Sequence, residues 1–180
     1  LSGNGEPTSA PEFAQAVAAV IRILKDYGLD RSVKLRLITN GSLLDKAAVQ
    51  EGIALIGAAG GEAWFKLDGG SESAMERING TRQTPDAVLR RLAACAARCE
   101  TWVQSCFFAM DGVPPAEDDV ADYLRLLGQA RTLIAGVHLY GLARPSCQPE
   151  AGRLGRLQAA WLEDLAARIR ACGLTVRVSP

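Results

Sequence analysis

The strongest constraint on the fold is a pattern that occurs five times: a helix-like stretch, a short apolar segment, and then a polar or glycine-rich loop. The apolar segments are residues 34–40, 63–68, 101–106, 136–140 and 175–179. Their starts lie roughly 28 to 40 residues apart, which is typical of βα units. Because right-handed βα crossovers make successive strands parallel, the pattern predicts an α/β fold with a parallel sheet or barrel. Such folds carry their chemistry in the loops that follow the strands.

Apolar residues recur at helical spacing in the stretches between these segments. The expected helices cover about residues 14–27, 44–57, 84–99, 117–129 and 156–171. Ser9 and Glu12 have the spacing of a capping box, with Pro11 in the first turn, and they predict the start of the first helix. Gly28 and Gly173 are suited to end the first and last helices, because glycine readily adopts the left-handed conformation of a C-cap.

Length and charge limit the classes of protein to consider. The 180 residues predict a single domain, residues 1–180, large enough to enclose a hydrophobic core. Twenty basic and twenty acidic residues cancel, so no overall field attracts nucleic acid or an anionic membrane. No apolar run reaches the ~18 residues of a membrane span. Five cysteines, an odd number, favour reduced thiols and a cytoplasmic location.

Polar side chains interrupt the apolar segments near their carboxyl ends. They are Asn40, Lys66, Asp68, Gln104, His138 and Tyr140. If these side chains share the inward face, parallel strands bring them together at one mouth of a barrel, where such folds bind ligands. A charged pair such as Lys66 and Asp68 costs free energy to bury without partners. The pair therefore indicates either a binding site or two charges that satisfy each other at a strand end.

Several familiar sites do not match this sequence. The glycine turn of residues 2–8 (SGNGEPT) lacks the third glycine of the dinucleotide fingerprint and the lysine of a phosphate loop. Cys95, Cys99 and Cys106 do not have zinc or ferredoxin spacing, and the first two fit the apolar face of a helix. His138 is the one histidine, which argues against a hydrolytic triad and against a metal-dependent barrel hydrolase. A hydrogen-bonded interior histidine is the favoured interpretation.

Five segments, taken in order, suggest a family. They are SGNGEPT (2–8), LITNGSLL (37–44), FKLDGG (65–70), MERIN (75–79) and VHLYGLARP (137–145). Together they resemble the radical S-adenosylmethionine (radical SAM) superfamily, in particular its branch related to wyosine-type tRNA-modifying enzymes. The resemblance covers nearly the whole chain, and most of these segments end a predicted strand.

The resemblance implies a partial (βα)6 TIM-like barrel, of which this chain would form the carboxy-terminal five-sixths. The first residue is not Met, and residues 1–3 read as the tail of a strand, so we expect an amino-terminal βα part to be missing. The implied activity is that of an oxidoreductase. A 4Fe–4S cluster cleaves S-adenosylmethionine to a 5′-deoxyadenosyl radical, with electrons from a reductant such as flavodoxin or ferredoxin. The substrate stays open among a small molecule, a peptide and RNA, with no membrane involved.

The resemblance also assigns roles to residues of this chain. Asn4, Gly5 and Glu6 match the family's glycine-glycine-glutamate motif, whose backbone holds the methionine amino group, although Asn4 replaces the usual first glycine. The remaining cofactor-binding positions implied at strand ends are Thr39, Asn40, Lys66, Asp68, Gln104 and Tyr140. Arg144, in the loop after the fourth apolar segment, is the candidate for binding an anionic substrate or cofactor group.

The iron–sulfur cluster is where the chain departs from the family. The family's C-x-x-x-C-x-x-C loop follows the first strand, and no cysteine trio in this chain replaces it. The cluster ligands are therefore expected upstream of Leu1, and this chain alone is expected to be inactive, with no metal ligands of its own. The alternative is a non-catalytic binding domain on a degenerate barrel of the same type.

Overall fold

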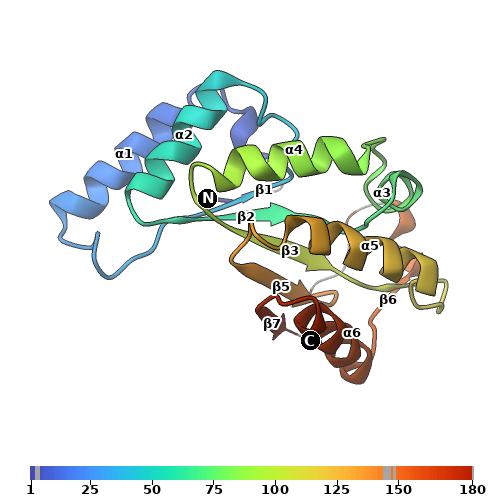
Figure 1. Cartoon of the computed structure of the whole chain (residues 1–180). Coiled ribbons are helices and arrows are strands. Elements are labelled where there is room, and N and C mark those ends of the chain that lie inside the picture. Colours follow the sequence, from blue (N-terminus) through green and yellow to red (C-terminus); the bar gives the residue numbers. More distant parts are fainter. Residues whose placement is uncertain (3–4, 144–146, 148, 180) are drawn as a thin grey trace.

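The structure is a computed structural model that describes residues 1–2, 5–143, 147 and 149–179. Its centre is a five-stranded parallel sheet with the order β1-β2-β3-β5-β7 (Figure 1). The strands are β1 (Arg36–Thr39), β2 (Glu62–Lys66), β3 (Glu100–Cys106), β5 (Gly136–Tyr140) and β7 (Val176–Ser179). The predicted α/β class with parallel strands is confirmed. Over the described residues the sheet is open and does not close into a barrel.

Five of the six helices lie where the sequence predicts them. They are α1 (Phe13–Asp26), α2 (Ala47–Ala58), α4 (Pro85–Ala96), α5 (Glu117–Ala130) and α6 (Ala159–Ala171). The sixth, α3 (Glu72–Asn79), was not expected, and neither were the short 3-10 helices η1 (Pro7–Ser9) and η2 (Pro149–Arg153). A small antiparallel sheet of β4 (Ala109–Met110) and β6 (Leu154–Gly155) was not expected either.

The helix ends show which local signals the chain uses. Gly28 and Gly173 have φ of +64° and +84° just after α1 and α6, as predicted. The predicted capping box is wrong. Glu12 is the N-cap of α1 but makes no side-chain cap hydrogen bond. Ser9 instead ends η1, and its hydroxyl donates to the Glu6 carbonyl oxygen at 2.7 Å, because the chain makes a separate short helical turn before α1.

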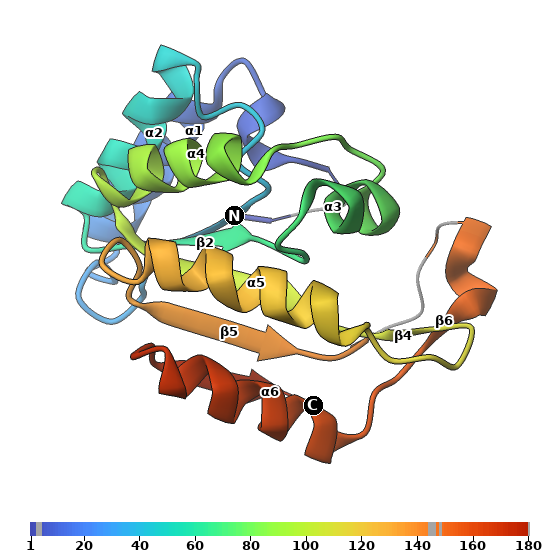
Figure 2. The ribbon, with the colours of Figure 1, turned by 45° about the vertical axis from the view of Figure 1, so that its right-hand side comes forward.

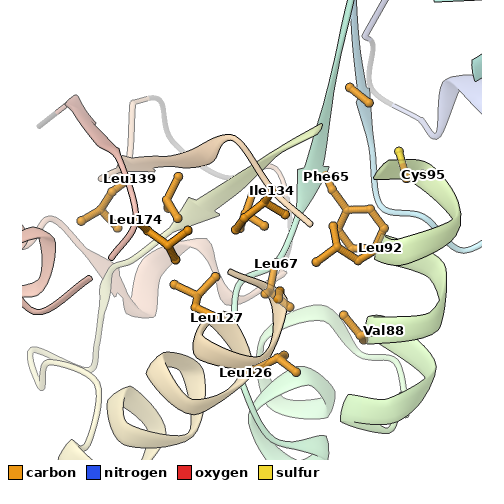
Figure 3. Packing of buried hydrophobic residues seen from close by; sticks show 14 of the residues in the cluster. Phe65, Leu67, Val88, Leu92, Cys95, Leu126, Leu127, Ile134, Leu139 and Leu174 are labelled. Carbon is orange, nitrogen blue, oxygen red and sulfur yellow. The ribbon is translucent and has the colours of Figure 1, made fainter. Parts of the chain in front are cut away.

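The hydrophobic core lies between the sheet and the helices. In β2, Ala63 and Phe65 are 0% and 2% exposed, whereas Trp64 and Lys66, which alternate with them, are only partly buried. Alternation therefore sends one set of strand residues to the helices and the other to the opposite face. One cluster of buried apolar residues includes members from every helix α1–α6. Figure 3 shows Phe65 pointing toward Leu92 of α4.

The amino terminus continues the sheet beyond β1. The Ile38 amide donates to the Leu1 carbonyl oxygen at 3.0 Å, and the Leu1 amino group donates to the Arg36 carbonyl oxygen. This alternation is the hydrogen-bond pattern of a parallel pair. At Leu1 it agrees with the expectation that a strand ends there, and Gly3 lies outside the described residues. Among the described residues, no helix is long and apolar enough to cross a membrane.

Glu62 carries an ion-pair network at the amino end of β2. Its side chain is 4% exposed and accepts from Lys34 Nζ at 2.7 Å and from Arg36 Nε at 2.9 Å. Trp64 Nε1 also donates to it, at 3.1 Å. Burial alone would raise the pKa of Glu62, but these hydrogen bonds outweigh it and lower the pKa to about 2. The network fixes the end of the sheet opposite the strand ends that carry the polar residues.

The lowered pKa predicts how stability responds to acid. The contribution of Glu62 is fully present above about pH 4.5 and is lost as pH falls toward about 2, the pKa in the folded state. Because both cations are partly exposed, we expect the lowered pKa of Glu62 to contribute only about 2 kcal/mol to the free energy of unfolding. Urea unfolding at pH 7, 4.5 and 2.5 should show a smaller acid loss for Glu62→Gln than for the parent chain. Glu51→Gln, at an exposed position of α2, should behave like the parent, and equal acid loss in all three chains would contradict the prediction.

Candidate functional site

The polar residues predicted from sequence gather on the sheet face away from the core, at its carboxyl edge. Lys66 of β2, Gln104 of β3 and His138 of β5 are register partners across adjacent strands. Cys106 and Tyr140 form the next pair toward the edge. All five are partly buried. In Figure 1 the arrows of β2 and β3 point toward α3, so this row lies where βα loops meet.

Lys66 connects two of the predicted site residues. Its Nζ lies 3.7 Å from Asp68 Oδ2 and 3.4 Å from the Tyr140 hydroxyl. Burial disfavours the Lys66 ammonium, but Asp68 and Tyr140 outweigh it and raise its pKa, so the side chain stays cationic. Burial raises the pKa of Asp68, whose Oδ1 also accepts from the Cys106 amide at 2.8 Å. The two charges satisfy each other in part, and Lys66, 38% exposed, can also reach a ligand.

Cys106 belongs to this row, although the sequence did not mark it. Burial and the charge of Asp68 raise the pKa of its thiol to about 11, so it is not a thiolate at neutral pH. Burial also raises the pKa of Tyr140. The row therefore presents one cation, one amide, one imidazole, one thiol and one phenol. This set can donate and accept hydrogen bonds, but it holds no activated nucleophile.

Glu6 fixes the glycine loop to the end of β1. Its Oε1 accepts from the Thr39 hydroxyl at 2.7 Å, the Thr8 hydroxyl at 2.7 Å and the Thr8 amide at 3.2 Å. Its Oε2 accepts from the Asn40 amide at 2.7 Å. The carboxylate is thus used within the protein, and only the backbone around Glu6 is left to contact a ligand. Thr39 is 1% exposed with its hydroxyl engaged, so its role is to anchor this loop.

The turn after β1 is equally constrained. Asn40 Oδ1 accepts from the Ser42 amide at 2.9 Å, a side-chain turn typical of asparagine. Gly41 has φ of +71°, and a Cβ there would lie 2.3 Å from the Phe65 ring. Gly41 is required because of its positive φ and its close approach to Phe65, and Asn40 stabilises the turn through its side chain. Asn40 itself is exposed at the carboxyl edge of the sheet.

Two tryptophan rings contact the polar row at His138. The His138 ring contacts both Trp64 and Trp102, and its centroid lies 4.2 Å and 4.8 Å from theirs. Burial, helped by Arg177, lowers the pKa of His138, so the ring is neutral near pH 7. Its Nε2 is buried without a hydrogen-bond partner, so the predicted hydrogen-bonded histidine is wrong at this atom. The aromatic stack, not hydrogen bonding at Nε2, holds the ring in place.

Gln104 Oε1 is the second buried polar atom without a partner among the described residues. Such atoms are costly, and they mark places where a ligand can restore the missing hydrogen bond. Gln104 lies between Lys66 and His138 in the register of the sheet. This atom makes the middle of the row a candidate binding position.

A cavity of about 340 Å³ adjoins the row and lies between the segments that follow β2 and β3. Asp68 and Cys106 line it, and so belong to both the row and the cavity. The other walls come from α3, from the chain around β4 and from the start of α5. Sequence reasoning missed the cavity because it depends on α3 and β4, neither of which was predicted.

Most of the other predicted positions can be located. Gly5 is exposed, and a Cβ there would meet nothing within 4 Å. Asn4 and Arg144 lie outside the described residues. The structure thus brings Lys66, Asp68, Gln104 and Tyr140 together; the Glu6 side chain and Thr39 form a separate anchor. Binding of a cofactor by any of them stays a prediction.

The described cysteines do not fit an iron–sulfur cluster. Cys95 and Cys99 are buried in the core, as predicted, and Cys147 is exposed. In the part of the chain that the structure describes, no group of three or more His, Cys, Asp or Glu could hold a metal ion. A 4Fe–4S cluster needs several thiolates at one place. The described cysteines do not provide such a set of thiolates.

The fold and the row define an α/β protein whose polar site lies at the carboxyl edge of an open parallel sheet. No protein-family model and no curated protein matches the chain in sequence. Solved structures of radical SAM enzymes do match it in fold. One is a domain of pyruvate-formate lyase-activating enzyme from Bacteroides vulgatus, with TM-score 0.62, 11% identity, and coverage of 95% of this chain and 96% of that one.

Two further structures share the fold. A radical SAM methyltransferase from Sphaerobacter thermophilus has TM-score 0.62 and 16% identity over 97% of this chain. TYW1 with a lysine-pyruvate adduct bound has TM-score 0.63 and 19% identity over 94% of this chain. The chain spans 48% of the length of each of these two proteins. The predicted resemblance is confirmed at the level of the fold, which is that of the radical SAM partial barrel.

Proposed function

We propose that this chain is the S-adenosylmethionine-binding part of a radical SAM enzyme. The observation that carries the proposal is the row of Lys66, Gln104 and Tyr140 at the carboxyl edge of a radical SAM fold. Gln104, which lies between Lys66 and His138 in the register of the sheet, has a buried carbonyl oxygen without a partner. The cofactor's amino, hydroxyl and carboxylate groups need both donors and acceptors, and the row offers both kinds.

The described residues fit the cofactor as follows. The backbone near Gly5, fixed by Glu6, would hold the methionine amino group. Lys66 would bind the carboxylate, and Asn40 and Asp68 would lie near the ribose. Gln104 and Tyr140 would line the rest of the cofactor site. When bound with its cluster, the cofactor supplies a 5′-deoxyadenosyl radical, and the protein's part is to orient it and exclude water.

The first test is binding of S-adenosylmethionine to the chain itself, measured by calorimetry. We expect Lys66→Met to weaken binding about tenfold, since a lost charge-assisted hydrogen bond costs roughly 1.5 kcal/mol. Lys46→Met, at an exposed position, should bind like the parent chain. Decarboxylated S-adenosylmethionine should bind the parent and Lys66→Met equally. Equal binding of the intact cofactor to both chains would contradict the role of Lys66.

The cluster requires a separate experiment on the whole protein. Anaerobic preparation should give about four irons and matching sulfide per chain, with a spectral change when S-adenosylmethionine is added. The second candidate function is a non-catalytic binding domain on the same fold. It predicts cofactor binding without iron. Absence of iron after reconstitution would therefore replace the first proposal with the second.

Two further parts of the proposal follow from the chemistry. A small electron carrier such as flavodoxin or ferredoxin would supply the reducing electron. A cytoplasmic location would keep the thiols reduced, which agrees with five free cysteines in the structure.

A further inference from the structure

The cavity of about 340 Å³ beside the polar row has a wall that is formed in advance. Asp111 and Gly112 have φ of +53° and +78° and join β4 to Val113 in a two-residue turn. Met110 and Val113 exchange backbone hydrogen bonds of 2.9 Å and 3.0 Å across that turn. This is the geometry of a tight β-hairpin, in which Asp-Gly is the favoured pair. The residues that face the cavity from this wall are therefore positioned before any ligand binds.

A second contact fixes the hairpin to the carboxy-terminal part of the chain. Arg153 donates from Nε and Nη2 to the Asp111 carboxylate at 3.0 Å and 2.7 Å. The Asp111 amide donates to the Arg153 carbonyl oxygen at 2.8 Å, and β4 pairs with β6. Figure 2 shows α3, β4 and β6 at the end of the sheet toward which the β5 arrow points. The cavity thus opens beside the strand ends that carry the row.

The charges around the cavity select the chemistry of a ligand. Every charged side chain that lines it has a partner. The pairs are Asp68 with Lys66 (3.7 Å), Asp119 with Arg77 (2.6 Å) and Asp111 with Arg153 (2.7 Å). A charged ligand would lose hydration without gaining a free counter-charge, which is unfavourable. The remaining walls are mainly apolar, with Ile78, Phe108, Met110, Val113, Pro114 and Pro115.

We propose that this cavity is the substrate pocket and that it takes an uncharged, largely apolar group. The identification of the ligand as the substrate rests on the proposed function. A group in the cavity reaches Asp68 and Cys106, which adjoin Lys66 and Tyr140, where the cofactor is proposed to bind. The volume is within the range of small-molecule pockets and admits an aromatic or branched aliphatic group.

Three indole compounds of similar size test the ligand class: tryptophol is neutral, tryptamine is cationic and indole-3-acetate is anionic. They are titrated into the 15N-labelled chain, without cofactor, and followed by amide chemical shifts. Tryptophol should shift the amides of Gly69, Ala74 and Met110 and should bind at least about tenfold more tightly than either ion. Equal or tighter binding of an ion, or shifts confined to other regions, would overturn the proposal.

Filling the cavity provides the matched test. Ile78→Trp on α3 places a large ring in the cavity, and Ile23→Trp makes the same change at a 53% exposed position of α1. Tryptophol binding should be lost in Ile78→Trp and unchanged in Ile23→Trp. Val113→Trp, at a 65% exposed hairpin residue that lines the cavity, is a second variant if Ile78→Trp does not fold. Unchanged binding in a folded cavity variant would overturn the proposal.

Cofactor binding by the same samples separates the two proposals. A chain that binds S-adenosylmethionine but not tryptophol overturns the pocket alone. A chain that binds tryptophol in the cavity but not S-adenosylmethionine contradicts the proposed function, and with it the assignment of the ligand as substrate. Retained cofactor affinity in Ile78→Trp, with loss of tryptophol, supports both.

Discussion

Replacing Gly70 with alanine should destabilise the chain by about 3 kcal/mol, because a Cβ at this position has no room. It would lie 2.1 Å from the Tyr123 amide nitrogen and 2.3 Å from the Tyr123 Cα, in the backbone of α5. The helix cannot easily move away, since the buried Tyr123 hydroxyl is 2.7 Å from the Ser105 hydroxyl of β3. Urea unfolding measures the loss. Any displacement of α5 that the new methyl group forces should also weaken tryptophol binding, because Asp119 of α5 lines the cavity.

Gly128 provides the control on the same helix. A Cβ there would meet nothing within 4 Å, so Gly128→Ala should stabilise the chain by about 0.5–1 kcal/mol through helix propensity. A loss in Gly70→Ala no larger than about 0.5 kcal/mol would show that the loop after β2 does not press on α5 as described.

Replacing Glu6 with alanine should lower the free energy of unfolding by about 2 kcal/mol and weaken S-adenosylmethionine binding more than tenfold. The carboxylate accepts four hydrogen bonds: two from Thr8 within the loop, and two from Thr39 and Asn40 that join the loop to the end of β1. Glu6→Gln should have an intermediate effect, because its amide group must face one of the present donors. Denaturation and calorimetry on the same samples measure both quantities.

Glu12→Ala is the matched control for Glu6. Glu12 lies six residues away, is exposed and makes no side-chain cap hydrogen bond, so its removal should change neither quantity. The role of Glu6 as an anchor would be refuted if both variants unfolded at the same urea concentration. Loss of stability with unchanged cofactor affinity would instead separate the anchor from the binding site.

The regular elements were predictable from sequence because they repeat a period. The strands around Phe65, Val103 and Leu139 alternate or run apolar, and long amphipathic helices separate them. Helix α3 was missed although Ser71 caps it and Gly80, with φ of +65°, ends it. At eight residues it is too short for periodicity to show. Strands β4 and β6 have two residues each, and the Asp111-Gly112 turn is a sequence signal only for the end of β4.

The site was predictable in part. Lys66, Gln104 and Tyr140 were found because they break apolar strands near their ends, and parallel register then brings them together. The Glu6 anchor could not be found, since its partners Thr39 and Asn40 are 33 and 34 residues away and nothing in the sequence pairs them with Glu6. The Trp64–His138–Trp102 stack depends on cross-strand register in the same way.

The two faces of the sheet have different consequences for how this protein can change over generations. Phe65 and Val103 are buried against helices, and substitutions there create cavities or clashes that cost stability. Lys66 and Gln104, their immediate neighbours in sequence, face away from that core and carry little of its packing. Selection can therefore alter the residues of the row, and with them what the edge binds, while the scaffold keeps folding. Neighbouring codons in one strand are thus under different selective constraints.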